Sequence, residues 1–263
     1  MAIQIFASPA DAGALQRYVQ ARPDPCAPIP AAEPMARTAH AVVLNAGGDP
    51  AAARAIGAAF ERDYQRLAGI FGLEPPGLPC TVYAVPGVGG AYHCGCDATT
   101  FFVDADARLG AAFCAAELVE VFEAALGNGW DCGATNGEAL SRALAAALHP
   151  EIAPDLAPTE VGWWDRGAAD YLSANVADDR DPDGNGCGTL FLYYLRDGLG
   201  RGWEAIARAG GGSLASTYAA LTGSDAGEAH ARFLDALAPF VDAGQQLILP
   251  ASGNPWAVLA TGS

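Results

Sequence analysis

The segment LGAAFCAAELVEVFEAAL, residues 109–126, constrains the fold more than any other part of the chain. At about 100° per residue, its apolar side chains cover nearly the whole circumference of a helix, which is typical of a helix buried in a core. Glu117 and Glu120 are three residues apart and share one face with Phe113 and Val121. Because a buried carboxylate must be protonated, paired or metal-bound, both glutamates are candidate functional residues. The alternative is that a cleft along this face hydrates them, or that an arginine neutralises them.

The other sequence patterns indicate the class of fold. Strand patterns occupy residues 3–6, 39–45, 80–86 and 99–106, and helical patterns occupy about 14–19 and 51–70. After residue 109 we expect helices near 109–126, 136–149, 163–174, 188–199, 203–209, 213–222 and 226–240. This order predicts an α+β fold in which a small mixed sheet packs against a larger helical half. We expect residues 1–38 to form an N-terminal strand, a helix and a proline-rich connector, and residues 39–263 to form a single domain.

The charge balance narrows the class of partner. The chain has 30 Asp and Glu residues against 14 Lys and Arg residues, which gives a formal net charge of −16. Nucleic acid and an anionic membrane surface both require a basic patch on the protein, so neither is expected as a partner. A small molecule or a peptide is the expected ligand.

Targeting signals and cysteine content indicate in which cellular compartment a protein is found. No apolar run reaches the ~18 residues that a transmembrane helix needs, and the start MAIQIFASPADAG does not have the pattern of a signal peptide. We therefore expect a cytoplasmic protein with most of its seven cysteines reduced, or an exported protein if this chain is a trimmed form. In an exported protein, the loop of Cys94 and Cys96 could form a disulfide with the segment of Cys132.

One run of elements follows the pattern of a known family. A strand precedes a helix that ends in FERDYQRLAGIFGLEPPGLP, and a strand TVYAVP, an edge strand TTFFVD and the central helix follow. From about residue 39 to 199 the chain thus resembles the gluzincins, the peptidase-MA-like zinc metallopeptidases. The resemblance implies a zincin-like fold and, as chemistry, hydrolysis of a peptide or a small amide.

The zinc motif of this family is H-E-x-x-H on the central helix, with a glutamate from a following helix as third ligand. The resemblance implies that Ala116 stands at the first histidine, Glu117 at the general base, and Glu120 at the second histidine, or Val121 in a shifted register. Glu138, in NGEALSRALA, matches the third ligand. The base is retained and both histidines are missing, so ordinary zinc peptidase activity is not expected.

Glu138 also fits a structural role. In TNGE, Thr135 is placed to cap the helix while Glu138 reaches back to the amide of the cap, which is a capping box. Arg142 lies four residues further on and forms a helical ion pair with Glu138 in this interpretation. Capping and a role in a site are compatible, and both interpretations stay open.

His93, in GGAYHCGC, is the most informative of the four histidines, because in the resembling fold this loop lies near the cleft. Together with Glu117, Glu120 and Glu138 it would form a site of one imidazole and several carboxylates. Such a donor set suits iron, manganese or magnesium better than structural zinc. A lone histidine in a loop is more often part of the polar surface, so no cofactor is assigned beyond this non-zinc divalent metal.

Two further motifs carry weaker signals. Cys187 stands at an expected helix N-terminus, which favours a thiolate nucleophile, although a buried structural cysteine is the more common case. DRDPDG, residues 179–184, matches the first half of a calcium loop, with an exposed acidic loop as the alternative.

The run WWDRGAADYLS echoes the peptidase helix W-x-x-E-G-x-A-x-Y-L, with Arg166 in place of the glutamate. Arg166 or Arg142 would in that case neutralise the buried glutamates. Trp163, Trp164 and Tyr171 are expected to pack in the core, or to form an aromatic wall beside a cleft.

Two functional hypotheses follow. The leading one is an enzyme on a peptidase-derived scaffold, with Glu117 as general base or acid and with Glu120, Glu138 and His93 nearby. The candidate ligand-binding residues are Tyr92, Arg142 and Arg166. The competing hypothesis is a catalytically inactive pseudo-peptidase that binds a peptide or a small-molecule ligand.

Overall fold

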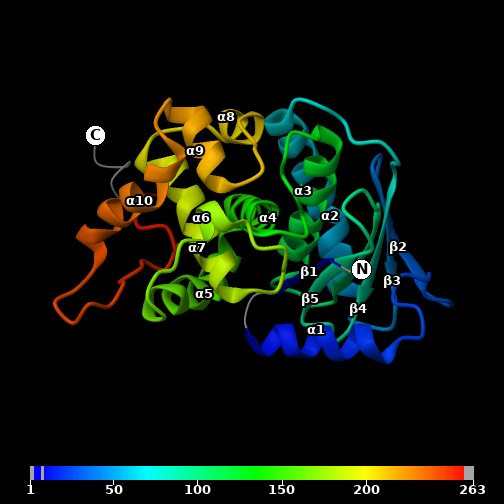
Figure 1. The fold of residues 1–263 in the computed structure, drawn as a ribbon. Coiled ribbons are helices and arrows are strands. Elements are labelled where there is room, and N and C mark those ends of the chain that lie inside the picture. Colours follow the sequence, from blue (N-terminus) through cyan, green and yellow to red (C-terminus); the bar gives the residue numbers. More distant parts are fainter. Residues whose placement is uncertain (1–2, 7–8, 258–263) are drawn as a thin grey trace. The chain divides into compact units, whose positions relative to one another are not determined.

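The computed structural model describes residues 3–6 and 9–257 and divides the chain into two units. Unit 1 comprises the chain up to Leu126 together with Leu144–Ile152, and unit 2 comprises Gly127–Ala143 and the chain from Ala153 onward. Unit 1 contains the β-sheet, and unit 2 is built mainly from helices (Figure 1). The predicted α+β class with a mixed sheet is therefore confirmed. Among the described residues, no helix has the length and apolar character needed to cross a membrane.

The six strands of unit 1 form one sheet. Their spatial order is β1 (Ile3–Phe6), β5 (Gly90–His93), β6 (Thr100–Asp104), β4 (Cys80–Val85), β3 (Ala41–Asn45) and β2 (Glu33–Arg37). The β3–β4 and β4–β6 pairs are parallel, and the other three pairs are antiparallel. Both edge strands, β1 and β2, come from the segment before residue 39, so this segment shares the sheet with the rest of unit 1.

Three helices accompany the sheet: α1 (Pro9–Ala21), α2 (Pro50–Phe71) and α3 (Gly110–Leu126). The boundaries of α2 follow from its sequence. Asp49 accepts the N–H of Ala51 at the start, and Gly72 ends the helix with a left-handed φ of 70°. α2 packs on α3 and on β2 and β3, while α3 packs on β5 and β6. The two helices are joined by Phe122 of α3, whose ring lies 5.6 Å from that of Tyr64 and 5.3 Å from that of Phe71.

A second aromatic cluster is formed by Tyr83, Tyr92 and Phe102, which come from β4, β5 and β6. Their rings stack with centroid distances of 5.3 Å for Tyr83–Phe102 and 4.7 Å for Tyr92–Phe102. The guanidinium of Arg22 lies 4.8 Å from the centre of the Phe102 ring, within the range of a cation–π interaction. This cluster fixes β5 to the centre of the sheet.

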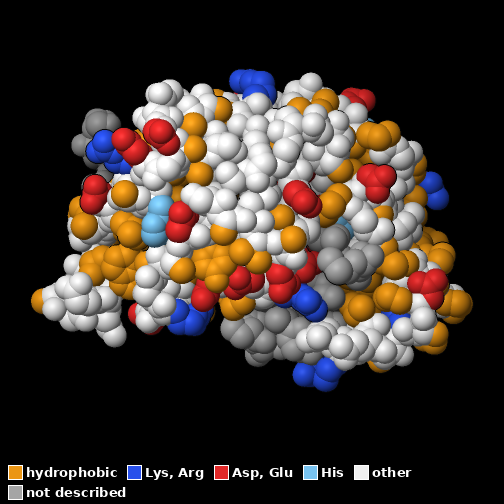
Figure 2. Space-filling view, viewed as in Figure 1, with side chains coloured by type: hydrophobic (Ala, Val, Ile, Leu, Met, Phe, Trp, Pro, Cys, Tyr) orange, Lys and Arg blue, Asp and Glu red, His pale blue; other side chains and the backbone are white. Residues whose placement is uncertain are grey.

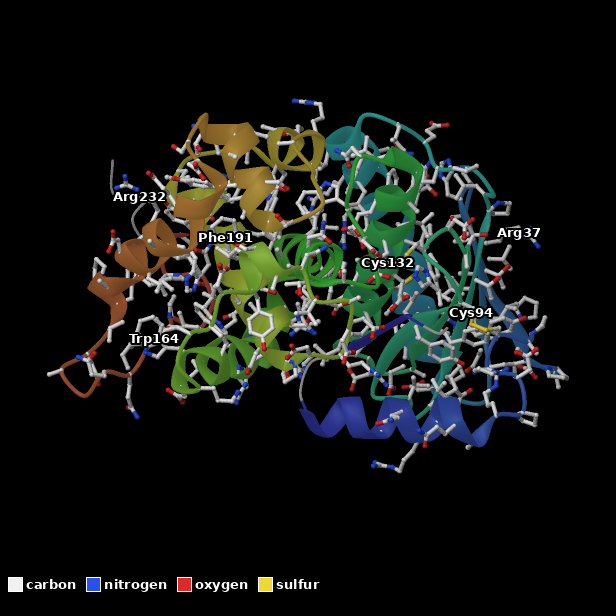
Figure 3. All side chains as sticks on the ribbon, in the orientation of Figure 1. Arg37, Cys94, Cys132, Trp164, Phe191 and Arg232 are labelled. Atoms are coloured by element: carbon white, nitrogen blue, oxygen red, sulfur yellow. A yellow bond between two sulfur atoms is a disulfide. The ribbon has the colours of Figure 1, made fainter. Side chains whose placement is uncertain are left out.

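A disulfide joins Cys26 to Cys94, which are 68 residues apart in the chain and come together at the end of β5 (Figure 3). In the chain-entropy model, closing a loop of this length contributes about 4 kcal/mol to stability. Cys96 and Cys132 are also disulfide-bonded. Four of the seven cysteines are thus oxidised, whereas a cytoplasmic protein was expected to keep most of them reduced.

Unit 2 consists of helices and short turns. Its helices are α5 (Ala153–Asp165), α6 (Tyr171–Ala174), α7 (Pro182–Tyr193), α8 (Trp203–Arg208), α9 (Leu214–Thr222) and α10 (Ala229–Leu237), and α4 (Thr135–Leu148) begins in unit 2 and ends in unit 1. α7 continues into a π-helical turn, Tyr194–Gly198. Phe191 lies in the core of this unit (Figure 3), with its ring 5.2 Å from that of Phe233 and 5.9 Å from that of Tyr194.

Two strands were not predicted from the sequence. β2 lies at the end of the proline-rich connector, where Pro34 is tolerated because β2 is an edge strand. β5 lies in the segment interpreted as a glycine-rich loop. The prediction that TTFFVD is an edge strand is wrong, because β5 and β1 lie beyond β6.

One helix was placed wrongly. The predicted helix 163–174 is interrupted after Asp165, because Gly167 and Ala168 adopt positive φ values of 97° and 50°, and the chain is helical again in α6, Tyr171–Ala174. α5 begins instead at Ala153 and contains Pro158, and a proline in a helix interior argues against a helix in any sequence-based prediction. The predicted helix 188–199 begins earlier, at Pro182, where Asp181 caps α7.

The Phe122 contacts predict a large cost of truncation. Because Phe122 is fully buried between α2 and α3, we expect Phe122→Ala to lower the free energy of unfolding by about 3–5 kcal/mol. Urea unfolding followed by circular dichroism measures this change. Arg54→Ala, on the exposed side of α2, is the control and should change stability by less than about 0.5 kcal/mol. Equal effects of the two substitutions would contradict the described packing.

Candidate functional site

The site in unit 1 is built from β5 and α3. β5 begins where the N–H of Gly89 donates to the Asp104 carboxylate, and His93 at its end pairs in register with Phe101 of β6. Successive residues of a strand point to opposite faces of the sheet. Tyr92 therefore joins the aromatic cluster with Phe102, while His93 lies on the other face, where α3 packs on β5.

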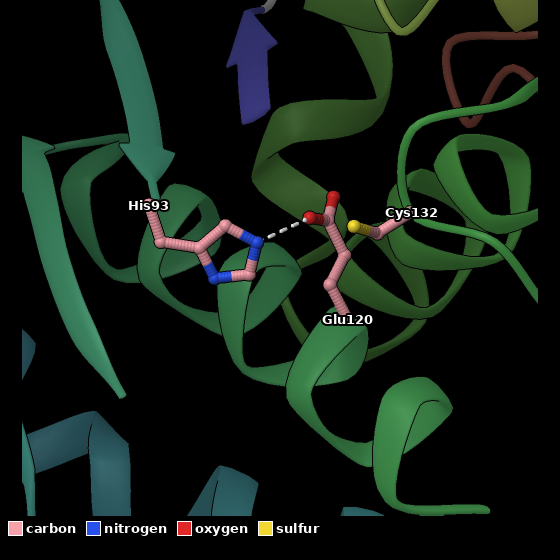
Figure 4. A group of neighbouring side chains, drawn as sticks. All are labelled: His93, Glu120 and Cys132. Carbon is pink, nitrogen blue, oxygen red and sulfur yellow. Dashed lines mark ion pairs between the residues drawn. The ribbon is translucent and has the colours of Figure 1, made fainter. Parts of the chain in front are cut away.

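The imidazole of His93 lies between two carboxylates of α3. Its Nε2 is 3.0 Å from Oε2 of Glu120 (Figure 4), and its Nδ1 is 3.8 Å from Oε2 of Glu117. All three side chains are fully buried. The helical wheel predicted that Glu117 and Glu120 share a face, and the structure adds that His93 faces both. The Nε2–Oε2 distance to Glu120 is within hydrogen-bond range, whereas the 3.8 Å between Nδ1 and Glu117 is an ion-pair distance only.

Two hollows border this face of α3. One, of about 60 Å³, is lined by Gly89, Asp104, Asp106, Leu109 and Phe113. The other, of about 330 Å³, is lined by Pro76, Asp97, Val121, Ala124 and Ala125. Phe113 precedes Glu117 by one helical turn and Val121 follows it by one turn, so the hollows flank the carboxylates along the helix. Neither hollow is lined by Glu117 or Glu120, and both carboxylates are fully buried. The alternative of a cleft that hydrates them is therefore not supported.

The donor set does not fit the zinc centre that the gluzincin resemblance implies. That centre takes two histidines from one helix, and on α3 the corresponding positions hold Ala116 and Glu120. Cys132, the third residue drawn in Figure 4, is disulfide-bonded, so its sulfur is not a thiolate ligand. The residues of unit 1 offer one imidazole and carboxylates, which is a donor set for harder metals or for proton transfer.

Unit 2 contains a buried cluster of charged groups of its own. Glu138 and Arg142 of α4 are fully buried and form the predicted i, i+4 ion pair, with 3.7 Å between Nη1 and Oε1. Arg142 also donates to the hydroxyl of Thr159, at 3.2 Å. Thr135 is the first residue of α4, and its hydroxyl donates to the carbonyl of Val176. The capping interpretation of Glu138 stays a prediction.

Glu160 is the residue of this cluster that sequence reasoning missed. It is fully buried on α5, and neither carboxylate oxygen has a hydrogen-bond partner among the described residues. Burial raises the pKa of Glu160 to about 8, and the nearby Arg142 lowers it only in part. Burial also lowers the pKa of Arg142. Glu160 is therefore a carboxylic acid that keeps its proton at neutral pH.

The other candidate ligand-binding residues, Arg166 and Tyr92, have partners of their own. Arg166 is exposed and pairs with Asp183. The hydroxyl of Tyr92 donates to the carbonyl of Pro25 and accepts from Arg22, and burial raises the pKa of Tyr92 to about 12. The structure therefore places Tyr92 and His93 on opposite faces of β5.

The two weaker motifs have structural roles. Burial raises the pKa of the Cys187 thiol, which opposes a role as nucleophile. In DRDPDG, Asp181 caps α7 by accepting the N–H of Asp183, and Asp183 binds Arg166. Two of the carboxylates proposed for calcium thus already have partners within the protein.

Comparison of the chain with protein-family models, curated proteins and solved structures gave no match. The functional assignment therefore rests on the residues and their geometry.

The raised pKa of Glu160 predicts a pH dependence of stability. A carboxyl group whose folded pKa exceeds its unfolded value stabilises the fold at low pH, and this contribution is lost as pH rises through the folded value. We expect the free energy of unfolding to fall between pH 5 and pH 9, by on the order of a few kcal/mol, and Glu160→Gln to remove most of this fall. Arg142 and Tyr193 share the cluster; burial lowers the pKa of Arg142 and raises that of Tyr193.

Chemical denaturation at several pH values tests this expectation. Glu228→Gln, an exposed glutamate of the same unit paired with Arg232, is the matched control and should keep the wild-type profile. A Glu160→Gln variant that follows the wild-type profile would show that Glu160 is ionised in the folded protein at neutral pH.

Proposed function

We propose that this chain is an acid–base enzyme of the hydrolase type, acting on a peptide or a small amide, on a zincin-like scaffold without the zinc histidines. The observation that carries the proposal is the imidazole of His93 between the carboxylates of Glu117 and Glu120, on a helix face bordered by hollows. Three buried titratable groups in contact are a common arrangement for moving protons.

The proton inventory of this cluster is sufficient for amide hydrolysis. The proposed cycle starts from a ring with two protons and two ionised carboxylates. Glu117 takes a proton from the attacking water, and the resulting hydroxide adds to the amide carbon. His93 gives one ring proton to the leaving nitrogen as the C–N bond breaks. Glu117 then returns its proton to the ring, which restores the starting state, and Glu120 holds Nε2–H throughout.

The proposal rests on unit 1 alone. The roles predicted for Glu138, Arg142, Arg166 and Tyr92 in catalysis or ligand binding stay predictions. The zincin-like scaffold is supported by the helix pair α2 and α3 beside a mixed sheet, with the glutamate pair on the more apolar helix. Because one fold hosts many activities, the scaffold supports the site and does not identify the substrate.

Substitution of Glu117 tests the enzyme hypothesis directly. We expect Glu117→Gln to lower kcat by about 10²–10⁴-fold with KM nearly unchanged, because the base acts in the chemical step and not in binding. His93→Gln should have a similar effect. Turnover of a panel of quenched fluorescent peptides and amino-acid p-nitroanilides provides the measurement.

A second His–Glu pair, His40 and Glu61, provides a matched control for this experiment. His40 Nδ1 lies 2.8 Å from Glu61 Oε1, on the partly exposed side of unit 1, and Glu61→Gln should leave kcat unchanged. If Glu117→Gln raises thermal stability and changes no rate, Glu117 is a structural relic. Ligand binding without turnover would favour the pseudo-peptidase.

A non-zinc divalent metal is a second candidate. His93 Nε2 and Glu120 Oε2 are 3.0 Å apart, a separation at which two donors share one ion, and Glu117 faces the other nitrogen as in carboxylate–histidine–metal triads. Such an ion would supply Lewis-acid chemistry. Because two of the described donors of unit 1, His93 Nε2 and Glu120 Oε2, meet in this position, we expect Mn²⁺ to bind more weakly than about 0.1 mM.

Electron paramagnetic resonance titration with Mn²⁺ and elemental analysis of protein prepared without chelators measure metal binding. His40→Gln is the control for histidine binding at other positions. A stoichiometric metal that is lost in both His93→Gln and Glu120→Gln would replace the proton-transfer proposal with a metal centre.

The oxidised cysteines favour an oxidising compartment for the folded protein. Structural disulfides persist in extracellular or periplasmic surroundings and are rare in the cytosol, and four cysteines of this chain are disulfide-bonded. This supports the exported form, which the sequence kept as the alternative to a cytoplasmic protein.

A further inference from the structure

Unit 2 contains a pocket of about 240 Å³ that the proposed function does not use. Its lining is Trp164, Leu234, Ala238, Val241, Asp242 and Gln245. Trp164 lies in the last turn of α5, Leu234 belongs to α10, and the other residues lie in the turns that follow α10. The sequence left open whether the tryptophan pair packs or forms a wall. Trp163 is buried, and its neighbour Trp164 lines this pocket (Figure 3).

Hydrogen bonds within the turn that follows α10 fix the shape of the pocket. Oδ1 of Asp242 accepts the N–H groups of Gly244 and Gln246, each at 2.9 Å, and Val241 bridges to Leu247. The indole N–H of Trp164 donates to the carbonyl of Gln245, at 2.9 Å. Because this hydrogen bond uses the polar edge of the indole, the part that Trp164 offers a ligand is the carbon surface of the ring.

The charge of the pocket is negative. Asp242 is exposed and forms no ion pair among the described residues, and no basic side chain lines the pocket. Acidic side chains are scattered over the surface of this acidic chain (Figure 2). An anionic ligand would meet the Asp242 carboxylate without a counter-charge, and a purely apolar ligand would make no use of that charge.

We propose that this pocket binds the alkylammonium group of an organic cation. Three features match such a group. The indole surface attracts a cation through its quadrupole, Leu234, Ala238 and Val241 contact the alkyl groups, and Asp242 supplies the opposite charge. A metal ion does not fit, because it requires several oxygen donors and the pocket offers one carboxylate and one amide side chain. The site lies in unit 2 and does not depend on the proposed acid–base function.

The probes are choline and its neutral isostere 3,3-dimethyl-1-butanol, which differ mainly in charge. The full-length chain is titrated with each, and the indole N–H signals are followed in ¹H–¹⁵N correlation spectra. We expect choline to shift the Trp164 signal with a Kd in about the millimolar range, because the contacts are few and partly hydrated. The alcohol should bind at least about tenfold more weakly, since it lacks the cation–π and charge terms.

Two substitutions separate the contributions of the ring and the charge. Trp164→Leu should weaken choline binding by about tenfold or more, and Asp242→Asn, which keeps the oxygen that caps the turn, should weaken it by about threefold to tenfold. The matched controls are Trp203→Leu, a partly buried tryptophan of unit 2, and Asp225→Asn, which caps the N–H of Gly227 in the same way. Neither control should change the Kd.

Several outcomes would overturn the proposal. They are equal affinities for choline and the alcohol, an unchanged Kd in Asp242→Asn, or shifts at indole signals other than that of Trp164. Unfolding of Trp164→Leu would be visible as a loss of spectral dispersion, and the Asp242→Asn variant then decides the question. A Kd that does not rise between 0.1 M and 0.5 M salt would also contradict the role of Asp242.

Discussion

The burial of α3 is the constraint on which unit 1 depends. Its apolar side chains pack on α2, β5 and β6, and the same packing takes Glu117 and Glu120 out of water. A buried carboxylate needs a compensating charge or a proton, and β5 provides His93, which faces both glutamates. Removing the ring would leave two carboxylates close together in a core. The packing of the sheet and the chemistry of the cluster are therefore parts of one arrangement.

Both units contain buried carboxylates, and these are compensated in different ways. In unit 1 a titratable imidazole, that of His93, lies between two carboxylates. In the proposed function, protons move within this cluster. In unit 2 the cation is Arg142, which does not release its proton at neutral pH. It pairs with Glu138, and Glu160 keeps its own proton instead. An arginine cluster of this kind holds helices together, whereas a histidine cluster serves acid–base chemistry, which is why the proposed function is assigned to unit 1.

The sequence period of α3 predicted the buried glutamates Glu117 and Glu120, but it did not predict which residues contact them. The apolar pattern around Glu117 identified a buried helix, because the 3.6-residue period of a helix determines which side chains share a face. The fold class followed from the order of the elements. His93 was assigned to a loop because β5 has only four residues and follows glycines, so its strand character depends on pairing with β1 and β6. Glu160 was missed because it lies on α5, and Pro158 within α5 made a helix there unexpected from residue propensities. The residues next to His93 and Glu160 in the sequence do not indicate which side chains these two residues contact in the fold.

The precision of the His93 cluster depends on how firmly β5 is held, because a strand of four residues has little stability of its own. β5 is paired on both edges, by β1 and β6. Tyr92, the residue before His93, is bonded to Pro25 and Arg22. Cys94, the residue after it, is cross-linked to Cys26. The neighbours of His93 on both sides are therefore fixed to the same loop, residues 22–27. A proton-transfer site requires its donors and acceptors to stay in place, and this loop supplies that rigidity from outside the sheet.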